Sequence, residues 1–266
     1  MSEDAPRVLI GTSGYSFRDW VGPFYPKGTK SGDFLRYYAT RFDTVEVNAT
    51  HYAIPHPRVI AEMEKKTPPG FHFTVKLNKE MTHGRSHDPA LYHQFLDVLE
   101  PLKVAGKYDG LLAQFPWGFR YNADSVRHLL AVRDALPGEP LYVEFRNDSW
   151  LRPGLEPWLR EQGLSYVSVD EPRLRGLIPP VTMVTGKDAY VRLHGRNAQN
   201  WYGTRGDRYD YDYSESELRE WLKKIGDLAD QARRTYLFFN NCHAGQAARN
   251  AKLMQELMRQ QKLGGA

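Results

Sequence analysis

The stretch Thr44-Val45-Glu46-Val47-Asn48 alternates apolar and polar side chains residue by residue. Successive side chains of a β-strand point to opposite faces, so Val45 and Val47 share one face and Glu46 and Asn48 share the other. β-Branched residues such as valine fit a packed strand surface well. The stretch therefore predicts a buried strand whose second face carries a carboxylate and an amide.

The same alternation recurs in four further segments, in which polar side chains gather toward the carboxyl end. In chain order, the polar faces carry His72, Thr74 and Lys76; Glu144 and Arg146; Ser168 and Asp170; and Arg192 and His194. Two more apolar segments finish near a single amide, Gln114 in one and Asn240 in the other. The predicted strands cover residues 7–11, 44–48, 71–77, 110–115, 141–146, 165–170, 189–194 and 235–240.

Helix-forming segments separate most of these strands. Asp88-Pro89 places an N-cap residue before a proline, and Ser214 with Glu217 fits a capping box. The stretch 171–187 holds prolines and glycines and predicts an irregular crossover instead. The predicted helices cover residues 32–42, 58–67, 88–104, 122–136, 155–162, 214–234 and 244–261.

Eight strands that alternate with helices predict an α/β fold with a parallel sheet. The chain has 266 residues, close to the roughly 250 that are typical of one (β/α)8 TIM barrel. The main alternative is an open doubly wound sheet, but Gly11-Thr12-Ser13-Gly14 does not have the glycine spacing of a dinucleotide-binding loop. We therefore predict a single (β/α)8 barrel domain over residues 1–266 and expect no cofactor.

The composition is that of a folded protein with a sizeable core, because 41% of the residues are hydrophobic and 26% are charged. Cys242 is the one cysteine, which excludes an internal disulfide and favours a reducing compartment. The sequence shows no signal peptide and no apolar run of the roughly 18 residues that a membrane span needs. We expect a cytoplasmic protein with no membrane partner. The net charge of +4 fits an anionic ligand or nucleic acid.

The polar faces predict a pocket. If the apolar faces meet the helices, the polar faces point into the barrel, near the strand ends where barrel enzymes build their sites. Buried charges need partners, so the carboxylates there are expected to pair with Lys76, Arg146 and Arg192. An internal ion-pair network without any ligand is the alternative. The candidates for acid–base catalysis, with Glu144 and His194 as first choices, are Glu46, Lys76, Glu144, Asp170 and His194.

A second expectation concerns an anion site after the last strand. Asn240-Asn241 is followed by Gly245 and then a helix, and barrels often bind phosphate at such a helix N-terminus. Arg192 or Arg196 would supply the charge. Ordinary helix capping by the asparagines is the alternative.

The segment 195–213 interleaves arginines with aromatic residues, an arrangement that suits phosphate contacts and base stacking. Asp207, Asp210 and Asp212 dilute its charge, so a folded lid over the barrel mouth is the alternative to a nucleic-acid interface. The residues concerned are Arg196, Arg205, Arg208, Trp201, Tyr202, Tyr209, Tyr211 and Tyr213.

Neither a catalytic metal site nor a cysteine nucleophile is the preferred interpretation. The pocket arginines and Lys76 would repel a divalent cation, so we expect no catalytic metal, although His83 and His87 form a loose pair. Cys242 beside His243 could be a nucleophile, but a non-catalytic small residue is the preferred interpretation.

An ordered set of motifs spans nearly the whole chain and resembles the YecE-like family, the domain of unknown function 72. The motifs are Ile10-Gly11-Thr12-Ser13-Gly14-Tyr15 with Trp20 and Phe24-Tyr25-Pro26, residues 42–52, Phe73-Thr74-Val75-Lys76 with Thr82-His83, Gln114-Phe115-Pro116, Glu144-Phe145-Arg146 with Ser149-Trp150, residues 191–196, and Phe239-Asn240-Asn241 with Gly245. Tyr15 and His51 stand where the family more often has tryptophan and phenylalanine. The resemblance implies a (β/α)8 barrel, likened to the xylose isomerase and endonuclease IV barrels, and no settled activity.

These observations predict a barrel that binds a small anionic or phosphorylated molecule at its C-terminal mouth. Hydrolysis, isomerisation and lyase chemistry without a metal stay open, as does the oligomeric state. The alternatives are a nucleic-acid-binding or endonuclease IV-like phosphodiesterase and a non-catalytic ligand-binding barrel. The expected ligand-binding residues are Tyr15, Asn48, Gln114, Arg146, Arg192, Arg196, Trp201, Asn240, Asn241 and Gly245.

Overall fold

Eight parallel strands form one sheet in the computed structural model, which describes residues 7–203 and 207–264. Each predicted strand overlaps an observed one, and the order around the sheet is β1-β8-β7-β6-β5-β4-β3-β2. The strands are β1 (Arg7–Thr12), β2 (Thr44–Val47), β3 (His72–Lys76), β4 (Tyr108–Gln114), β5 (Leu141–Glu144), β6 (Ser165–Asp170), β7 (Ala189–Leu193) and β8 (Arg234–Phe239).

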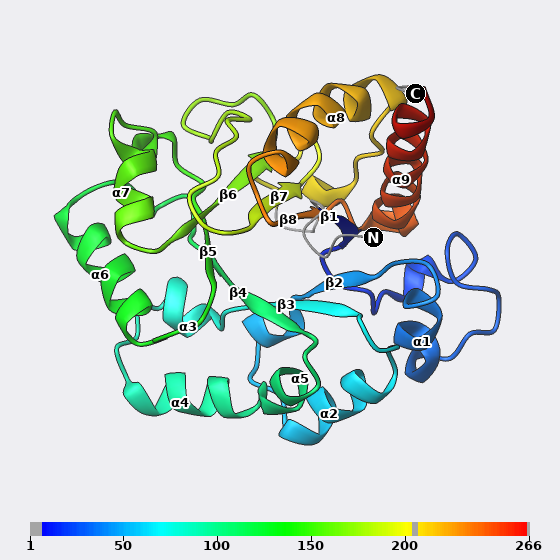
Figure 1. Cartoon of the computed structure of the whole chain (residues 1–266), viewed down its shortest axis with the longest axis horizontal. Helices are drawn as coiled ribbons and strands as arrows, with labels where there is room; N and C mark the ends of the chain where they lie inside the picture. The colour runs from blue at the N-terminus through cyan, green and yellow to red at the C-terminus, as the bar shows by residue number, and fades with distance from the viewer. Residues whose placement is uncertain (1–6, 204–206, 265–266) are drawn as a thin grey trace.

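Helices surround this sheet (Figure 1). They are α1 (Phe34–Tyr38), α2 (Pro57–Lys65), α3 (Lys79–Thr82), α4 (Pro89–Asp97), α5 (Glu100–Val104), α6 (Ala123–Asp134), α7 (Leu155–Glu161), α8 (Glu215–Ala229) and α9 (Gln246–Gly264). Short 3-10 turns lie at η1 (Arg18–Trp20), η2 (Ser31–Asp33), η3 (Ala49–His51), η4 (Asp148–Trp150), η5 (Asp207–Tyr209) and η6 (His243–Gly245).

The predicted helices are confirmed in kind, and the capping signals explain where several begin. Asp88 caps α4, and Ser214 and Glu217 form the predicted capping box of α8. The predicted helix 88–104 is in fact two helices, because Pro101 lies in the first turn of α5, where a missing N–H costs nothing. The stretch between β6 and β7 holds no helix, as predicted. The short helix α3 was not predicted.

The sheet closes between β1 and β2 without a regular ladder. In the described residues, one bridge joins Ser13 to Glu46 there, and the Gly14 amide donates to the Glu46 carbonyl at 2.8 Å. The buried Tyr38 hydroxyl fills the gap: it accepts from the Thr12 amide at 2.9 Å and donates to the Thr44 carbonyl at 3.0 Å. We call this junction the seam. The result is a nearly closed barrel.

The approach of the two strands at the seam also demands a glycine. A Cβ atom on Gly11 would lie 2.2 Å from the Thr44 carbonyl oxygen, which is less than any real contact allows. Gly11 therefore permits the first strand to come close enough for closure.

The barrel interior is filled in layers. At its N-terminal end, Asp109 bonds His72 at 2.5 Å and Arg234 at 3.0 Å. Tyr142 and Tyr190 pack against one another in the middle, with ring centroids 4.6 Å apart and the ring planes tilted by 43°. The charged residues of the C-terminal layer lie above these rings.

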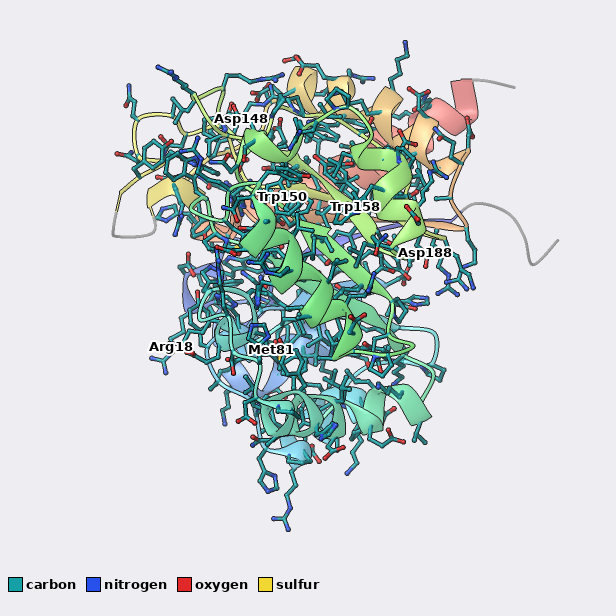
Figure 2. All side chains as sticks on the ribbon, turned by 90° about the vertical axis from the view of Figure 1, so that its left-hand side faces the viewer. Arg18, Met81, Asp148, Trp150, Trp158 and Asp188 are labelled. Carbon is teal, nitrogen blue, oxygen red and sulfur yellow. The ribbon has the colours of Figure 1, made fainter. Side chains whose placement is uncertain are left out.

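The two ends of the barrel are distinguished in Figure 2. Arg18 and Asp148, which follow β1 and β5, lie on one side of the molecule, and Asp188, which precedes β7, lies on the other. The side that carries Arg18 and Asp148 is the C-terminal mouth, where the site is found.

Candidate functional site

Arg192 is the centre of a fully buried ion network inside the barrel. Its guanidinium donates to Glu46 at 2.7 Å and to Glu144 at 2.5 Å, and Tyr190 donates to the other Glu46 oxygen at 2.7 Å. Ser13 lies 3.4 Å from the same guanidinium. The predicted pairing of these carboxylates with arginine is thus confirmed, and their side chains have no exposed surface.

A second arginine extends this network toward the mouth. Arg146 donates to Glu144 at 2.5 Å and to Glu171 at 2.9 Å. Burial would raise the pKa of Glu144, but Arg146 and Arg192 together hold it well below its ordinary value. Burial raises the pKa of Glu171 to about 7, although Arg146 opposes the shift. Glu144 is therefore a permanent anion, which makes it unsuited to act as a general acid.

His194 lies beneath the site and is fully buried. Its Nδ1 accepts from the Asn240 amide at 2.9 Å, and its Nε2 is 3.2 Å from Glu144. Burial and the Arg146 charge lower the pKa of His194 to about 3, so the ring is neutral. Glu46, Glu144 and His194 are thus enclosed by partners within the protein, and their expected role in catalysis stays a prediction.

Asp170 lies on the outer face of β6, so the prediction that it lines the pocket is wrong. The register pairs Val169 with Arg192 and Asp170 with Leu193, so the valines of β6 face the interior. Asp170 faces the helices, where it accepts from Arg196 and Tyr213, each at 2.8 Å. The polar side chains of a strand can face the helices when hydrogen-bond donors are available there. The inward carboxylate is the next residue, Glu171.

The expected anion site after β8 is filled by the protein itself. The Asp19 carboxylate accepts from the Ala244 amide at 2.7 Å, and a Cβ on Gly245 would meet Pro23 at 3.0 Å. Asn241 is fully buried and donates to Tyr211 and Asn250. The Asp19 carboxylate, and not either asparagine, thus occupies the helix N-terminus, so capping by Asn240 or Asn241 does not describe this corner either.

The two arginines expected at that corner point away from it. Arg192 is enclosed in the barrel, and Arg196 lies outside with Asp170, Glu217 and Glu220. Alternate residues of one strand share a face, but β7 ends at Leu193, so this rule does not extend from Arg192 to Arg196. Asn240 and Arg192 line an interior cavity instead.

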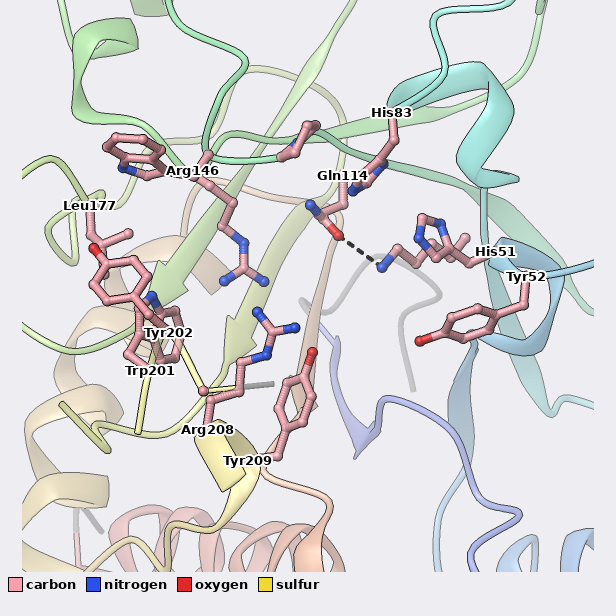
Figure 3. A pocket seen from close by; sticks show the side chains of 14 residues that line it. His51, Tyr52, His83, Gln114, Arg146, Leu177, Trp201, Tyr202, Arg208 and Tyr209 are labelled. Carbon is pink, nitrogen blue, oxygen red and sulfur yellow. Dashed lines mark hydrogen bonds between the residues drawn. The ribbon is translucent and has the colours of Figure 1, made fainter. Parts of the chain in front are cut away.

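An open cavity of about 550 Å³ lies over the mouth (Figure 3). Arg146 and Arg208 point toward one another across it in Figure 3. Exposed aromatic side chains form part of its rim. It is lined by His51, Tyr52, Lys76, His83, Gln114, Pro116, Trp117, Arg146, Leu177, Trp201, Tyr202, Gly203, Arg208 and Tyr209.

A smaller cavity of about 170 Å³ continues this space into the barrel. It has room for about six water-sized groups. Both cavities are lined by Tyr52, Lys76, Gln114, Arg146 and Tyr209, so they are two parts of one site. The inner part is further lined by Ser13, Phe17, Asn48, Arg192, Asn240 and Cys242.

The inner wall is rich in amides and cations. The Asn48 Oδ1 atom is buried and has no hydrogen-bond partner among the described residues. Burial raises the pKa of the Cys242 thiol, which supports the interpretation of Cys242 as a non-catalytic residue. A ligand that donates a hydrogen bond would satisfy the Asn48 acceptor.

Lys76 lies at the carboxyl end of β3, where the inner and outer cavities meet. Its Nζ donates to the Gln114 Oε1 at 2.9 Å, and Gln114 is fixed by a bond from its Nε2 to the Phe115 carbonyl at 2.7 Å. Among the described residues, no carboxylate lies within 4.0 Å of this amine. Burial and the Arg192 charge lower the pKa of Lys76 to about 7. Of the five residues proposed for catalysis, Lys76 is the one that lines the cavities.

Two histidines beside Lys76 were not proposed as site residues. The His51 Nδ1 lies 3.1 Å from the Leu77 carbonyl, so it carries the proton and leaves Nε2 as a free base. The His83 ring packs against His51 with centroids 5.0 Å apart. Burial and the Lys76 charge lower the pKa of both histidines to about 4. The motif pattern contained both positions, but only the fold brings them next to the lysine.

The segment after β7 packs two of its aromatic side chains, Trp201 and Tyr213, onto the protein and leaves Tyr202 exposed. Trp201 is buried, and the Arg146 guanidinium carbon lies 5.8 Å from its ring centroid. Tyr213 is buried against Phe239. Arg208 enters the cavity wall, whereas Arg205 lies outside the described residues. This arrangement fits the folded-lid interpretation better than a stacking platform.

Some of the expected ligand-binding residues line the cavities, and the others lie outside them. Asn48, Gln114, Arg146, Arg192, Trp201 and Asn240 line one or both cavities. Tyr15 packs beside Tyr38, with ring centroids 6.2 Å apart, away from the cavity linings. Arg196, Asn241 and Gly245 lie outside them.

Two further properties concern residues 7–203 and 207–264 alone. No group of three or more His, Cys, Asp or Glu side chains is arranged there to hold a metal ion. Among the helices of this part of the chain, none has both the length and the apolar character to cross a bilayer.

Similarity to known proteins extends over nearly the whole chain. The pattern of the family described as protein of unknown function DUF72 matches residues 9–265. The protein YunF of Bacillus subtilis (strain 168) is 32% identical over 269 aligned positions, which cover 94% of each chain. The protein YecE of Escherichia coli (strain K12) is 25% identical, over 90% of this chain and 88% of its own.

Solved structures give the same assignment. A DUF72 family protein from Thermotoga maritima is 39% identical and superposes with a TM-score of 0.88, covering 95% of this chain and 99% of its own. One from Enterococcus faecalis is 25% identical with a TM-score of 0.82, covering 96% and 99%. The sequence motifs, the barrel and these matches agree, and the chain therefore belongs to the DUF72 family.

Proposed function

We propose that the cavity at the C-terminal mouth binds a small anionic molecule and can carry out acid–base chemistry on it. The observation that carries this proposal is Lys76, an amine in the cavity wall whose one hydrogen-bond partner in the described chain is the neutral Gln114 amide. An anionic group beside it would gain a charge-assisted hydrogen bond. The low local dielectric would strengthen that bond.

Two arginines support the choice of an anion. Arg146 remains a cation between Glu144 and Glu171 and presents part of its surface to both cavities. Arg208 faces it from the segment after β7 (Figure 3). A phosphate or carboxylate between these groups would be contacted from several sides. The free Asn48 oxygen favours a ligand that also bears a hydroxyl or other donor.

Acid–base chemistry is supported by the groups around the same point. Lys76, with a pKa of about 7, can hold or release a proton near neutral pH. His51, which is neutral, offers an unprotonated ring nitrogen close by. A proton acceptor and a proton donor are thus available without the enclosed carboxylates below.

Isothermal titration calorimetry with inorganic phosphate, pyruvate and glycerol phosphate tests the binding proposal. Lys76→Met should weaken binding by about 10- to 150-fold, the equivalent of the roughly 1.5–3 kcal/mol of a hydrogen bond to a charged group. Lys76→Arg, which keeps the charge, should bind much as the parent does. The control is Arg160→Gln, which changes an exposed arginine of α7. The proposal fails if the parent binds none of these anions at millimolar concentration, or if Lys76→Met binds them unchanged.

A further inference from the structure

Among the described residues, the buried Lys107 and the half-buried Lys76 have different surroundings. Lys107 donates to the Glu64 carboxylate at 2.7 Å and also to the Glu64 carbonyl, the Thr67 carbonyl and the Thr67 hydroxyl. Those acceptors can take all three protons of an ammonium ion. Lys76 has the single Gln114 oxygen as its acceptor within the described chain. Lys107 thus has a full set of acceptors that includes a carboxylate, whereas Lys76 has a single neutral acceptor.

The electrostatic surroundings of Lys76 favour its neutral form. Burial and the charge of Arg192 lower its pKa to about 7, although Glu144 and Glu46 oppose the shift; Arg146 makes a smaller contribution in the same direction as Arg192. Near neutral pH about half of such side chains carry a free electron pair, against roughly one in a thousand or fewer for an ordinary lysine. A neutral lysine amine is a nucleophile toward carbonyl carbon.

The position of Lys76 gives this nucleophile access to a ligand. Its side chain lines both the inner and the outer cavity, so a carbonyl group that enters from the mouth can reach its amine. Arg146 and Arg208 flank the outer part and Asn48 and Asn240 the inner part. The inner part of about 170 Å³ is small, and the outer part of about 550 Å³ leaves room for the rest of a larger molecule.

We propose that Lys76 forms an imine with a small carbonyl compound that carries a carboxylate or phosphate group. This inference rests on the proposed anion site and names the chemical class of its ligand. The amine attacks the carbonyl carbon to give a carbinolamine, and the carbinolamine oxygen leaves as water after it gains a proton. Ammonium and carbonyl thus become a protonated imine and one water molecule, with no change in oxidation state.

The neighbouring histidines supply the next step. A protonated imine withdraws electrons from the adjacent carbon and acidifies a hydrogen on it. The unprotonated Nε2 of His51 can accept that proton, and His83 packs against the same ring. The constellation suits reactions that begin with loss of a proton next to a carbonyl group.

Reductive trapping tests the proposal. The full chain is incubated with pyruvate, or separately with pyridoxal 5′-phosphate, and sodium borohydride is added to reduce any imine to a stable amine. Intact-mass and peptide mass spectrometry then locate the adduct. We expect one adduct per chain, on Lys76, from at least one probe. Lys76→Arg should lose this adduct, although it keeps the positive charge.

Lys224→Arg is the matched control. Lys224 is also partly buried, bonds the neutral Pro180 carbonyl at 2.7 Å and has a pKa that burial lowers, but it lies on α8, away from the cavity linings. This variant should be labelled as the parent is. The imine proposal is overturned if neither probe labels the parent, or if Lys76→Arg is labelled to the same extent. Calorimetric binding of pyruvate without any adduct would overturn the imine and leave the anion site standing, whereas absence of both would remove the anion site as well.

Discussion

Arg192 and Glu144 meet across the barrel interior at 2.5 Å, although β6 separates their two strands. Neither side chain is exposed, and the same guanidinium neutralises Glu46. The charge of Arg192 thus holds two carboxylates whose side chains have no exposed surface.

Removal of this cation should be costly. Arg192→Leu would leave Glu46 without an ionic partner and Glu144 with Arg146 alone, and breaking a buried ion pair typically costs about 3–5 kcal/mol. We expect the free energy of unfolding, measured by urea denaturation at pH 7, to fall by about that amount. Arg160→Gln, which removes an exposed ion pair, should change it by less than about 1 kcal/mol. Equal effects of the two substitutions would show that the buried network does not stabilise the fold.

Substitutions of Arg196 and Arg208, which both lie in the segment after β7, should affect ligand binding differently. Arg208 lines the cavity, whereas Arg196 pairs with Asp170 and Glu217 outside it. Arg208→Gln should weaken phosphate binding about two- to fivefold, as expected for a charge worth up to roughly 1 kcal/mol. Arg196→Gln should leave the dissociation constant unchanged. Calorimetry on variants shown to be folded by circular dichroism measures both, and a loss confined to Arg196→Gln would restore the anion corner after β8.

Stability should depend on pH through His194. Its folded pKa of about 3 lies below the ordinary value of 6.5, so between these values the unfolded chain binds a proton that the folded chain does not. Stability therefore falls as the pH drops from about 6.5 toward 3, by about 1.4 kcal/mol per unit at most from this group. His194→Gln should show a shallower fall in the free energy of unfolding between pH 7 and pH 4.

The control for this measurement is His93→Gln, which changes an exposed histidine of α4. That variant should keep the slope of the parent. If His194→Gln keeps it too, the imidazole does not stay neutral in the folded chain.

The barrel could be predicted from the sequence because strand alternation and helix caps are local signals. Lys76 and Gln114 were both expected in the pocket, but the sequence predicted a carboxylate partner for Lys76, and its observed partner is the Gln114 amide. Asp170 and Glu171 show the limit of the pattern. Both are acidic and adjacent, and the register with β7 decides which faces inward. Local alternation contains no information about that register.

The anion corner was mispredicted for a different reason. The helix N-terminus after β8 has the expected glycine and asparagines, but its free amide is taken by Asp19, which is 225 positions away. Trp20 makes a second such link, donating to the Cys242 carbonyl at 2.7 Å. Contacts between the segments after β1 and β8 depend on barrel closure and have no local signature in the sequence.

The Tyr38 hydroxyl holds the seam of the barrel closed. At the other joints backbone groups hold the strands together, but between β1 and β2 a side-chain hydroxyl, that of Tyr38, takes the place of a backbone partner. Tyr38→Phe should therefore speed hydrogen exchange of the Thr12 and Gly14 amides, while the Leu193 amide in β7 keeps its protection. Glu46 lies at the seam and bonds Arg192, so each opening of the seam would disturb the charges beneath Lys76. Opening of the seam and a change in the charge distribution at the mouth would then occur together.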